Sequence, residues 1–150
     1  MRSVIFFLLI CSAAAAAEGS LKSLSIRRIA DHFSAMKAED RVPAFGTFMK
    51  GATFHVPPDD YITFRSDGKV VHRNRIGASG NRGVIAEWAV KSGRIDVKTA
   101  DRKAMDAIFG YEEIRFENIT VSSNEQASPQ SVDFCFDGKL DLFYMKEEQD

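Results

Sequence analysis

The stretch YITFRSDGKVVHRNRIGASGNRGVIAEWAVKSGRIDVKT, residues 61–99, decides the fold because it has the pattern of four short β-strands joined by tight turns. Apolar and polar residues alternate on both sides of Ser92-Gly93 with the period of two that a strand requires. A two-residue loop there brings the apolar residues of both strands onto one face, and Val84, Ala86, Trp88 and Val90 share that face of the first strand. The expected cross-strand pairs are Val90 with Ile95, Trp88 with Val97 and Glu87 with Lys98.

Two Asp-Gly turns predict the register of two further hairpins. In the last hairpin every apolar position is even-numbered, and these positions are Val132, Phe134, Phe136, Leu140, Leu142 and Tyr144. A two-residue loop would pair even with odd positions, so we predict a three-residue loop with Gly138 at positive φ in a bulge. The same turn at Asp67-Gly68 would place on one face Ile62, Phe64, Val70 and His72.

The first 17 residues have the pattern of a signal peptide. Arg2 is the positive start, residues 4–11 are the apolar centre, and residues 13–17 supply an Ala-x-Ala cleavage site. The apolar run is too short to span a bilayer as a helix, so we expect no transmembrane segment after cleavage. The remaining residues, 18–150, are expected to form one domain with a single core.

Charge and cysteine content narrow the compartment and the partners. Cleavage after Ala17 removes Arg2 and leaves 19 basic and 21 acidic residues, a net charge of −2. This balance gives no case for a nucleic-acid partner. Cleavage also removes Cys11, so the remaining Cys135 could form no internal disulfide, and an exported chain without disulfides is typical of the bacterial periplasm. We therefore expect a periplasmic or secreted protein.

The rest of the chain adds helices and further strands. A helix is expected over residues 20–39, where apolar residues recur near the helical period, and another over residues 102–109, with Asp101 as N-cap and Gly110 at its end. We expect residues 42–50 to be a connector, residues 52–56 to be a strand, and residues 112–118 to be a strand with a break near Glu117. About eight strands in sequential hairpins predict a mainly β (α+β) fold, an antiparallel meander curled into a barrel or half-barrel.

This arrangement resembles the lipocalin-like group of small exported bacterial β-barrel proteins of unknown function. The resemblance rests on Phe64-Arg-Ser-Asp-Gly-Lys69 and on Trp88-Ala-Val-Lys-Ser-Gly-Arg-Ile95. The Gly-x-Trp signature near the start of lipocalins is absent, since Trp88 lies in the middle of the chain. The resemblance implies binding of a small apolar ligand or of no ligand, and a shared fold does not decide between the two.

The titratable residues form no catalytic or metal-binding motif. The only histidines are His32, His55 and His72. None of them lies at a catalytic spacing, and there is no Cys pair, His-x-x-x-His or Asp-rich calcium loop. Cys135 shares a strand face with Asp133 and Asp137, and nearby carboxylates raise the pKa of a thiol, which disfavours the reactive thiolate. We therefore predict a non-enzymatic protein without metal or cofactor.

One cluster of cations is the best candidate for a binding surface. It consists of Arg65, Lys69, His72, Arg73, Arg75 and Arg82, with no acidic residue between Lys69 and Arg82. Alternation places Lys69, Arg73 and Arg75 on one strand face, where they could dock an anionic partner. The alternative is a solvated face whose charge is balanced by the acids of a neighbouring strand. The candidate ligand-binding residues are Lys69, His72, Arg73, Arg75 and Trp88.

Two functional hypotheses follow from these patterns. The first is an exported, non-enzymatic binding module for a small apolar or anionic ligand. The second is a structural or interaction protein of the cell envelope that docks an anionic component through the basic strand face. An interior cavity lined by Trp88 and phenylalanines would favour the first hypothesis, and a filled interior with a basic exterior would favour the second. An enzyme whose site is assembled from scattered residues is the third alternative.

Overall fold

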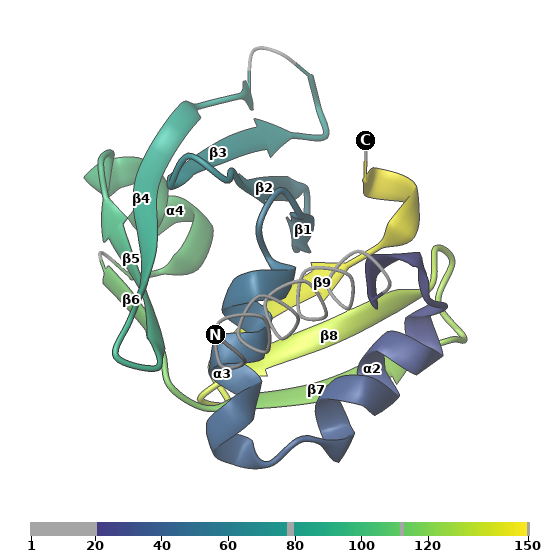
Figure 1. The fold of residues 1–150 in the computed structure, drawn as a ribbon. Coiled ribbons are helices and arrows are strands. Elements are labelled where there is room, and N and C mark those ends of the chain that lie inside the picture. Colours follow the sequence, from purple (N-terminus) through teal and green to yellow (C-terminus); the bar gives the residue numbers. More distant parts are fainter. Residues whose placement is uncertain (1–20, 78–79, 112, 150) are drawn as a thin grey trace, which may run out of the picture.

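The fold is a curled sheet with helices packed against it (Figure 1). The computed structural model describes residues 21–77, 80–111 and 113–149, so the expected signal peptide lies outside the described residues. The helices are α2 (Ile26–Ala35), α3 (Ala38–Phe48), α4 (Arg102–Phe109) and the 3₁₀ helix η2 (Lys146–Glu148). The strands are β1 (Thr53–Val56), β2 (Asp60–Phe64), β3 (Lys69–Asn74), β4 (Gly83–Lys91), β5 (Arg94–Thr99), β6 (Glu113–Phe116), β7 (Ile119–Asn124), β8 (Ser131–Phe136) and β9 (Leu140–Tyr144).

All nine strands belong to one antiparallel sheet in the order β6-β5-β4-β3-β2-β1-β9-β8-β7. Neighbouring strands are consecutive in the sequence except where β1 pairs with β9. The two edge strands, β6 and β7, follow each other directly in the chain, so the sheet must curl until its edges approach (Figure 1). The predicted antiparallel meander curled into a half-barrel is therefore confirmed, with nine strands instead of about eight.

The predicted hairpin registers are confirmed. Strands β4 and β5 pair Val90 with Ile95, Trp88 with Val97 and Glu87 with Lys98 around Ser92-Gly93. Strands β8 and β9 pair even with even positions, and Gly138 has a φ of 66°. Strands β2 and β3 also pair even with even positions, and Gly68 has a φ of 84°. As a result, Ile62, Phe64, Val70 and His72 are all buried on one face of these strands.

The expected face of β4 needs a correction at both of its ends. A bulge between β3 and β4 pairs Val71 with Val84 and Val70 with Ala86, which leaves Ile85 as the extra residue. Ile85 is fully buried as a result, whereas Val84 and Val90 are each 44% exposed. The carbonyl of Ile85 accepts hydrogen bonds from the backbone N–H groups of Ala100 and Asp101, so the bulge also fixes the chain before α4.

The N-terminal helical region also differs from expectation. Residues 20–39 are not one helix, because α2 begins after the N-cap Ser25 and ends at Ala35, and a new helix starts at Ala38. The guanidinium of Arg41 in α3 explains this break, since it donates to the carbonyls of Ser34 and Met36 at the end of α2, at 3.1 and 3.3 Å.

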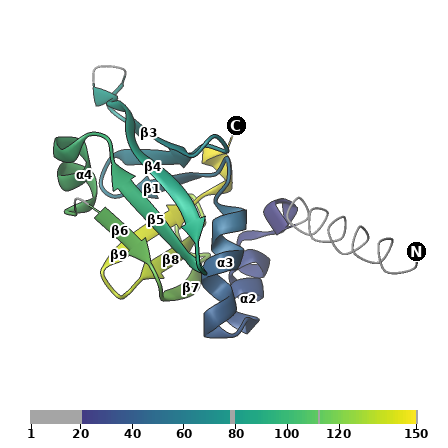
Figure 2. The same ribbon diagram turned by 60° about the vertical axis from the view of Figure 1, so that its left-hand side comes forward.

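The expected connector at residues 42–50 is wrong, because most of it lies in α3. Pro43 and Gly46 suggested a break, yet both lie inside the helix. Burial of Phe45 and Phe48 offsets the lost backbone hydrogen bond at Pro43. Gly46 is required by packing, since a Cβ there would lie 2.7 Å from Cγ2 of Val90 on β4. This close approach sets α3 against the sheet, where it contacts β5 and β7 (Figure 2).

Aromatic side chains fill the interior of the half-barrel. Phe45 of α3 is its centre, with ring centroids 4.9–6.2 Å from those of four phenylalanines on the strands. These are Phe54, Phe116, Phe134 and Phe136. Phe33 of α2 adds an edge contact to Phe134 at 5.2 Å. Such dense packing between helices and sheet is the main source of stability in a domain of this size.

The C-terminal half agrees with the sequence prediction. Asp101 caps α4 by accepting from the backbone N–H of Ala104 at 3.1 Å, and Gly110 ends the helix with a φ of 72°. Ile114 and Phe116 of β6 point inward, and the strand breaks before Ile119 as expected. The edge of β7 is covered by the helices, because Arg41 and Ser34 donate to its carbonyls at Ile119 and Val121. In the described part of the chain, no helix has both the length and the apolar character to cross a membrane.

Candidate ligand-binding groove

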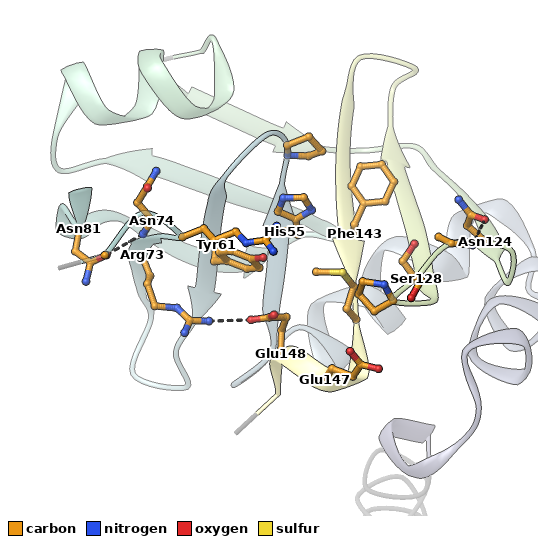
Figure 3. Close-up of a pocket in the computed structure, with 17 residues that line it drawn as sticks. His55, Tyr61, Arg73, Asn74, Asn81, Asn124, Ser128, Phe143, Glu147 and Glu148 are labelled. Atoms are coloured by element: carbon orange, nitrogen blue, oxygen red, sulfur yellow. Dashed lines mark hydrogen bonds and ion pairs between the residues drawn. The ribbon is translucent and has the colours of Figure 1, made fainter. Parts of the chain in front are cut away.

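An open groove of about 870 Å³ lies on the outer face of the sheet (Figure 3). Its floor is formed by β1, β2 and β9, and β3 forms one wall. The segment between β7 and β8 forms the opposite wall, and η2 borders a long side. The groove therefore joins parts of the chain as far apart in sequence as His55 and Glu148, and the pairing of β1 with β9 brings them together.

The floor of the groove is a row of rings that crosses the strands. Arg73 lies opposite Tyr61, Tyr61 opposite His55, and His55 opposite Phe143 in the register of the sheet. The guanidinium carbon of Arg73 lies 5.1 Å from the centroid of the Tyr61 ring. The ring of His55 lies 5.0 Å from Tyr61 and 6.4 Å from Phe143. The result is a row of rings with a cation at one end, in which Tyr61 is only 7% exposed and lies beneath the guanidinium of Arg73.

The two arginines of the groove differ in their partners. Arg73 is held by Glu148 of η2 at 3.1 Å (Figure 3). Gln149 fixes the segment that carries Glu148. Its side-chain amide accepts a hydrogen bond from the backbone N–H of Thr53 and donates one to the Thr53 carbonyl, in the same way as the backbone of a neighbouring strand. Arg75 also lines the groove, and no ion pair is formed by its guanidinium among the described residues. Arg75 is therefore the cation available to a ligand.

Two asparagines on opposite walls present amide donors to the groove (Figure 3). Oδ1 of Asn81 accepts from the backbone N–H of Asn74 at 2.8 Å, and Oδ1 of Asn124 accepts from the N–H of Ala127 at 3.1 Å. Because the oxygen of each amide is engaged, its NH₂ group remains for a partner. The lining therefore combines the amide donors of these asparagines with two acidic side chains, Glu147 and Glu148, on its long side.

The five candidate residues from the sequence do not form one site. Arg73 and Arg75 lie in the groove, whereas Lys69 and Trp88 border a separate surface hollow. Lys69 forms an ion pair with Glu87 of β4, which lowers the pKa of Glu87 through a hydrogen bond and charge attraction. An acid of a neighbouring strand thus balances part of the basic face, as in the alternative interpretation. Lys98 lies opposite Glu87 in the register of the sheet, but the ion-pair partner of Glu87 is Lys69.

Trp88 and His72 are buried parts of the structure. Trp88 is 8% exposed, and its indole N–H donates to the carbonyl of Arg65 at 2.9 Å. His72 accepts from the backbone N–H of Arg82 through Nδ1, so the proton is on Nε2, which donates to Asp60 at 2.7 Å. Both nitrogens of the imidazole are therefore engaged within the protein, and His72 binds strands β2 and β3 to the chain before β4.

A second feature of the outer face is a pair of carboxyl groups around Cys135. Burial raises the pKa of the Cys135 thiol, and the hydrogen bond and charge of Asp141, with the charge of Asp133, raise it further. The expected direction is confirmed, although Asp141 of β9 takes the place expected for Asp137. Cys135 is a free cysteine that stays protonated at neutral pH.

Stability should fall with rising pH because of Asp133. Burial, followed by the hydrogen bond and charge of Asp141, raises its pKa from 3.8 to about 7. The folded protein therefore holds a proton that the unfolded chain releases near pH 4, and the resulting stability is lost as the pH rises through 7. Asp133→Asn places a side chain beside Asp141 that is neutral at every pH. The free energy of unfolding of this variant minus that of the wild type should therefore increase from pH 4 to pH 8. Urea unfolding at both pH values measures this, and a constant difference would contradict the assignment.

Sequence reasoning missed most of the groove residues. These are His55, Tyr61, Asn81, Asn124 and Phe143. A signal for part of the set was present, because Phe143 lies between Leu142 and Tyr144 and therefore on the face expected to meet solvent. A single aromatic residue on an outward strand face is common, so this signal alone does not predict a binding surface.

Comparison with known proteins adds no relative. No family model, no curated protein and no solved structure matches this chain. Within the residues that the structure describes, no group of three or more His, Cys, Asp or Glu side chains is placed to hold a metal ion. The lipocalin-like resemblance stays a prediction, and any function must be argued from the groove itself.

Proposed function

We propose that this protein is an exported, non-enzymatic binding module that docks an anionic component of the cell envelope in the outer groove. The observation that supports this proposal most is the position of Arg75, a cation without an ion-pair partner in the described chain, beside an aromatic floor. Arginine binds carboxylate and phosphate groups through paired hydrogen bonds, and the aromatic floor supplies apolar contact for the rest of the ligand.

The filled interior favours the envelope-docking hypothesis over an apolar ligand held inside the barrel. An apolar ligand would need space near Trp88, but Phe64 packs edge-on against Trp88 at 6.1 Å. The centre of the half-barrel is occupied by Phe45 and its four neighbours. The groove lies on the outer face, where Arg73 of β3 and Arg75, just after that strand, are among its lining residues.

Ion pairs outside the groove neutralise part of the basic cluster, whereas Arg75 in the groove has no ion-pair partner among the described residues. Arg65 pairs with Asp67 at 2.6 Å and Lys69 pairs with Glu87, and both pairs lie outside the groove. Arg73 pairs with Glu148, but this pair is at the groove wall and an anionic ligand could share the guanidinium. The non-enzymatic part of the proposal is supported by His55 and His72, whose described hydrogen bonds go to backbone groups and Asp60 and to no hydroxyl or thiol.

The double variant Arg73→Gln/Arg75→Gln should lose retention on anionic material at low salt. A hydrogen bond to a charged group contributes about 1.5–3 kcal/mol, so the loss should be roughly tenfold or more. Retention on phosphatidylglycerol vesicles and on polygalacturonate beads would be measured at low salt and at physiological salt, where exposed charges are screened.

The matched control is Lys91→Gln/Lys98→Gln, which removes the same charge from exposed positions on β4 and β5, outside the groove. This control should keep its retention. Equal retention by the groove variant and the control, with both folded, would reject the proposed function.

A further inference from the structure

We propose that the ligand of the groove is an acidic saccharide, a chain of sugar rings that carries carboxylate groups. This inference rests on the proposed function and makes it specific. The sugar rings would lie on Phe143 and His55, with a carboxylate at Arg75, while Tyr61 is buried beneath the guanidinium of Arg73. Three properties of the groove support this choice: the spacing of its open rings, the amide donors on its walls and the absence of an apolar rim.

The spacing of the aromatic row suits a chain of rings better than a single headgroup. The three rings belong to adjacent strands, which lie about 4.8 Å apart in a sheet. The centroids of His55 and Phe143, the two rings of the row that are not buried, are 6.4 Å apart, close to the length of one sugar unit. The C–H groups of a sugar ring form an apolar, slightly positive face, which packs on the negative face of an aromatic ring. Successive sugars can therefore contact successive strands.

The hydrogen-bonding groups suit a ligand rich in oxygen. The NH₂ groups of Asn81 and Asn124 stand on opposite walls, and backbone N–H groups fix their orientation by binding their oxygens. Hydroxyl, ring and carboxylate oxygens of a saccharide accept such hydrogen bonds. Glu147 on the long side can accept hydrogen bonds from sugar hydroxyls. A carboxylate of the saccharide would bind at Arg75, which has no ion-pair partner among the described residues.

The groove lacks the apolar rim that a lipid surface would require. Large apolar side chains are exposed in the described chain at Ile76, Val84, Val90 and Tyr111. Only Ile76, which is 80% exposed, follows the groove residue Arg75 in sequence, and a single isoleucine is an ordinary surface feature. Anionic lipid headgroups would be attracted by Arg75 as well, but the structure offers no surface for their chains.

The test uses oligogalacturonate and the same oligosaccharide after its carboxylates have been reduced to alcohols. Calorimetric titration of the wild-type protein should show about tenfold tighter binding of the acidic form. Arg75→Gln should bring the two affinities close together, whereas Phe143→Leu should weaken both by a similar factor because it removes a ring platform. Lys98→Gln, an exposed cation outside the groove, should behave as the wild type. Trp88 fluorescence verifies that each variant is folded.

The outcomes separate this inference from the proposed function. Retention on phosphatidylglycerol vesicles that depends on Arg75, without binding of oligogalacturonate, would overturn the saccharide inference and leave the proposed function standing. Binding of oligogalacturonate that Arg75→Gln and Phe143→Leu leave unchanged would also overturn it, because the saccharide would then lie elsewhere. Failure to bind either probe would overturn both proposals.

Discussion

Replacing Phe45 by alanine is expected to lower the free energy of unfolding by about 3–5 kcal/mol, the range for a buried phenylalanine. Phe45 is fully buried and its ring meets four other phenylalanine rings from β1, β6 and β8. Aromatic contacts of this kind contribute roughly 0.5–1.5 kcal/mol beyond the buried area. The side chain also fixes α3 to the sheet, so a cavity at this position would loosen the whole interior.

Urea unfolding followed by circular dichroism measures this loss, with Tyr111→Ala as the control. Tyr111 is 42% exposed, so its replacement should change stability by about 0.5 kcal/mol or less. If Phe45→Ala and Tyr111→Ala had the same free energy of unfolding, residues 42–50 would not form a helix packed inside the half-barrel.

Replacing Trp88 by alanine is expected to cost a similar amount, about 3–5 kcal/mol. The indole lies in the middle of β4, opposite Val97, and contacts the edge of Phe64. Its N–H group holds the carbonyl of Arg65 in the turn before β3. The alanine variant loses the buried area and also leaves that carbonyl without its partner.

The variant Trp88→Phe separates these contributions, because it keeps a ring and loses the hydrogen bond. Its cost should be smaller than that of Trp88→Ala by urea unfolding. Trp88 is the only tryptophan in the chain, so fluorescence quenching by acrylamide reports on this residue alone. Strong quenching in the native wild type would show that Trp88 is exposed and that the assigned sheet face is wrong.

The hairpins could be predicted from sequence because short-range patterns determine them. Ser92-Gly93 and the parity of the apolar positions fix the pairing of Trp88 and Phe134, and no distant contact is needed. The bulge at Ile85 could not be predicted in the same way. The contacts that favour it are the hydrogen bonds that the Ile85 carbonyl accepts from the N–H groups of Ala100 and Asp101, just before α4. The alternation within the strand does not encode these contacts.

The error at α3 has a physical origin. Pro43 and Gly46 have low helix propensity and predict a connector, whereas Val42, Phe45 and Met49 follow the helical period. Tertiary packing then overrides propensity, because the buried aromatic side chains need the helix and Gly46 lets it approach β4. Similarly, the helix break at Met36 depends on Arg41, whose partners could not be known from local sequence.

The groove could be predicted only in part. Alternation placed Arg73 and Arg75 on one outward face, and the structure locates both in the groove. The aromatic partners His55 and Phe143 are 88 residues apart in sequence and meet only because β1 pairs with β9. Such a long-range pairing leaves no mark on the local pattern. The partner of Arg73, Glu148, likewise lies in a charged segment that suggests only a solvated tail.

The central claim is that the outer groove, and not the interior, holds an anionic ligand. Titration of oligogalacturonate into ¹⁵N-labelled protein tests this directly by nuclear magnetic resonance. We expect shifts in the amide signals of Tyr61, Asn81 and Phe143 and in the side-chain N–H of Arg75, while the indole N–H signal of Trp88 stays in place. Shifts concentrated at Trp88 and at the interior phenylalanines, with the groove signals unchanged, would contradict the account.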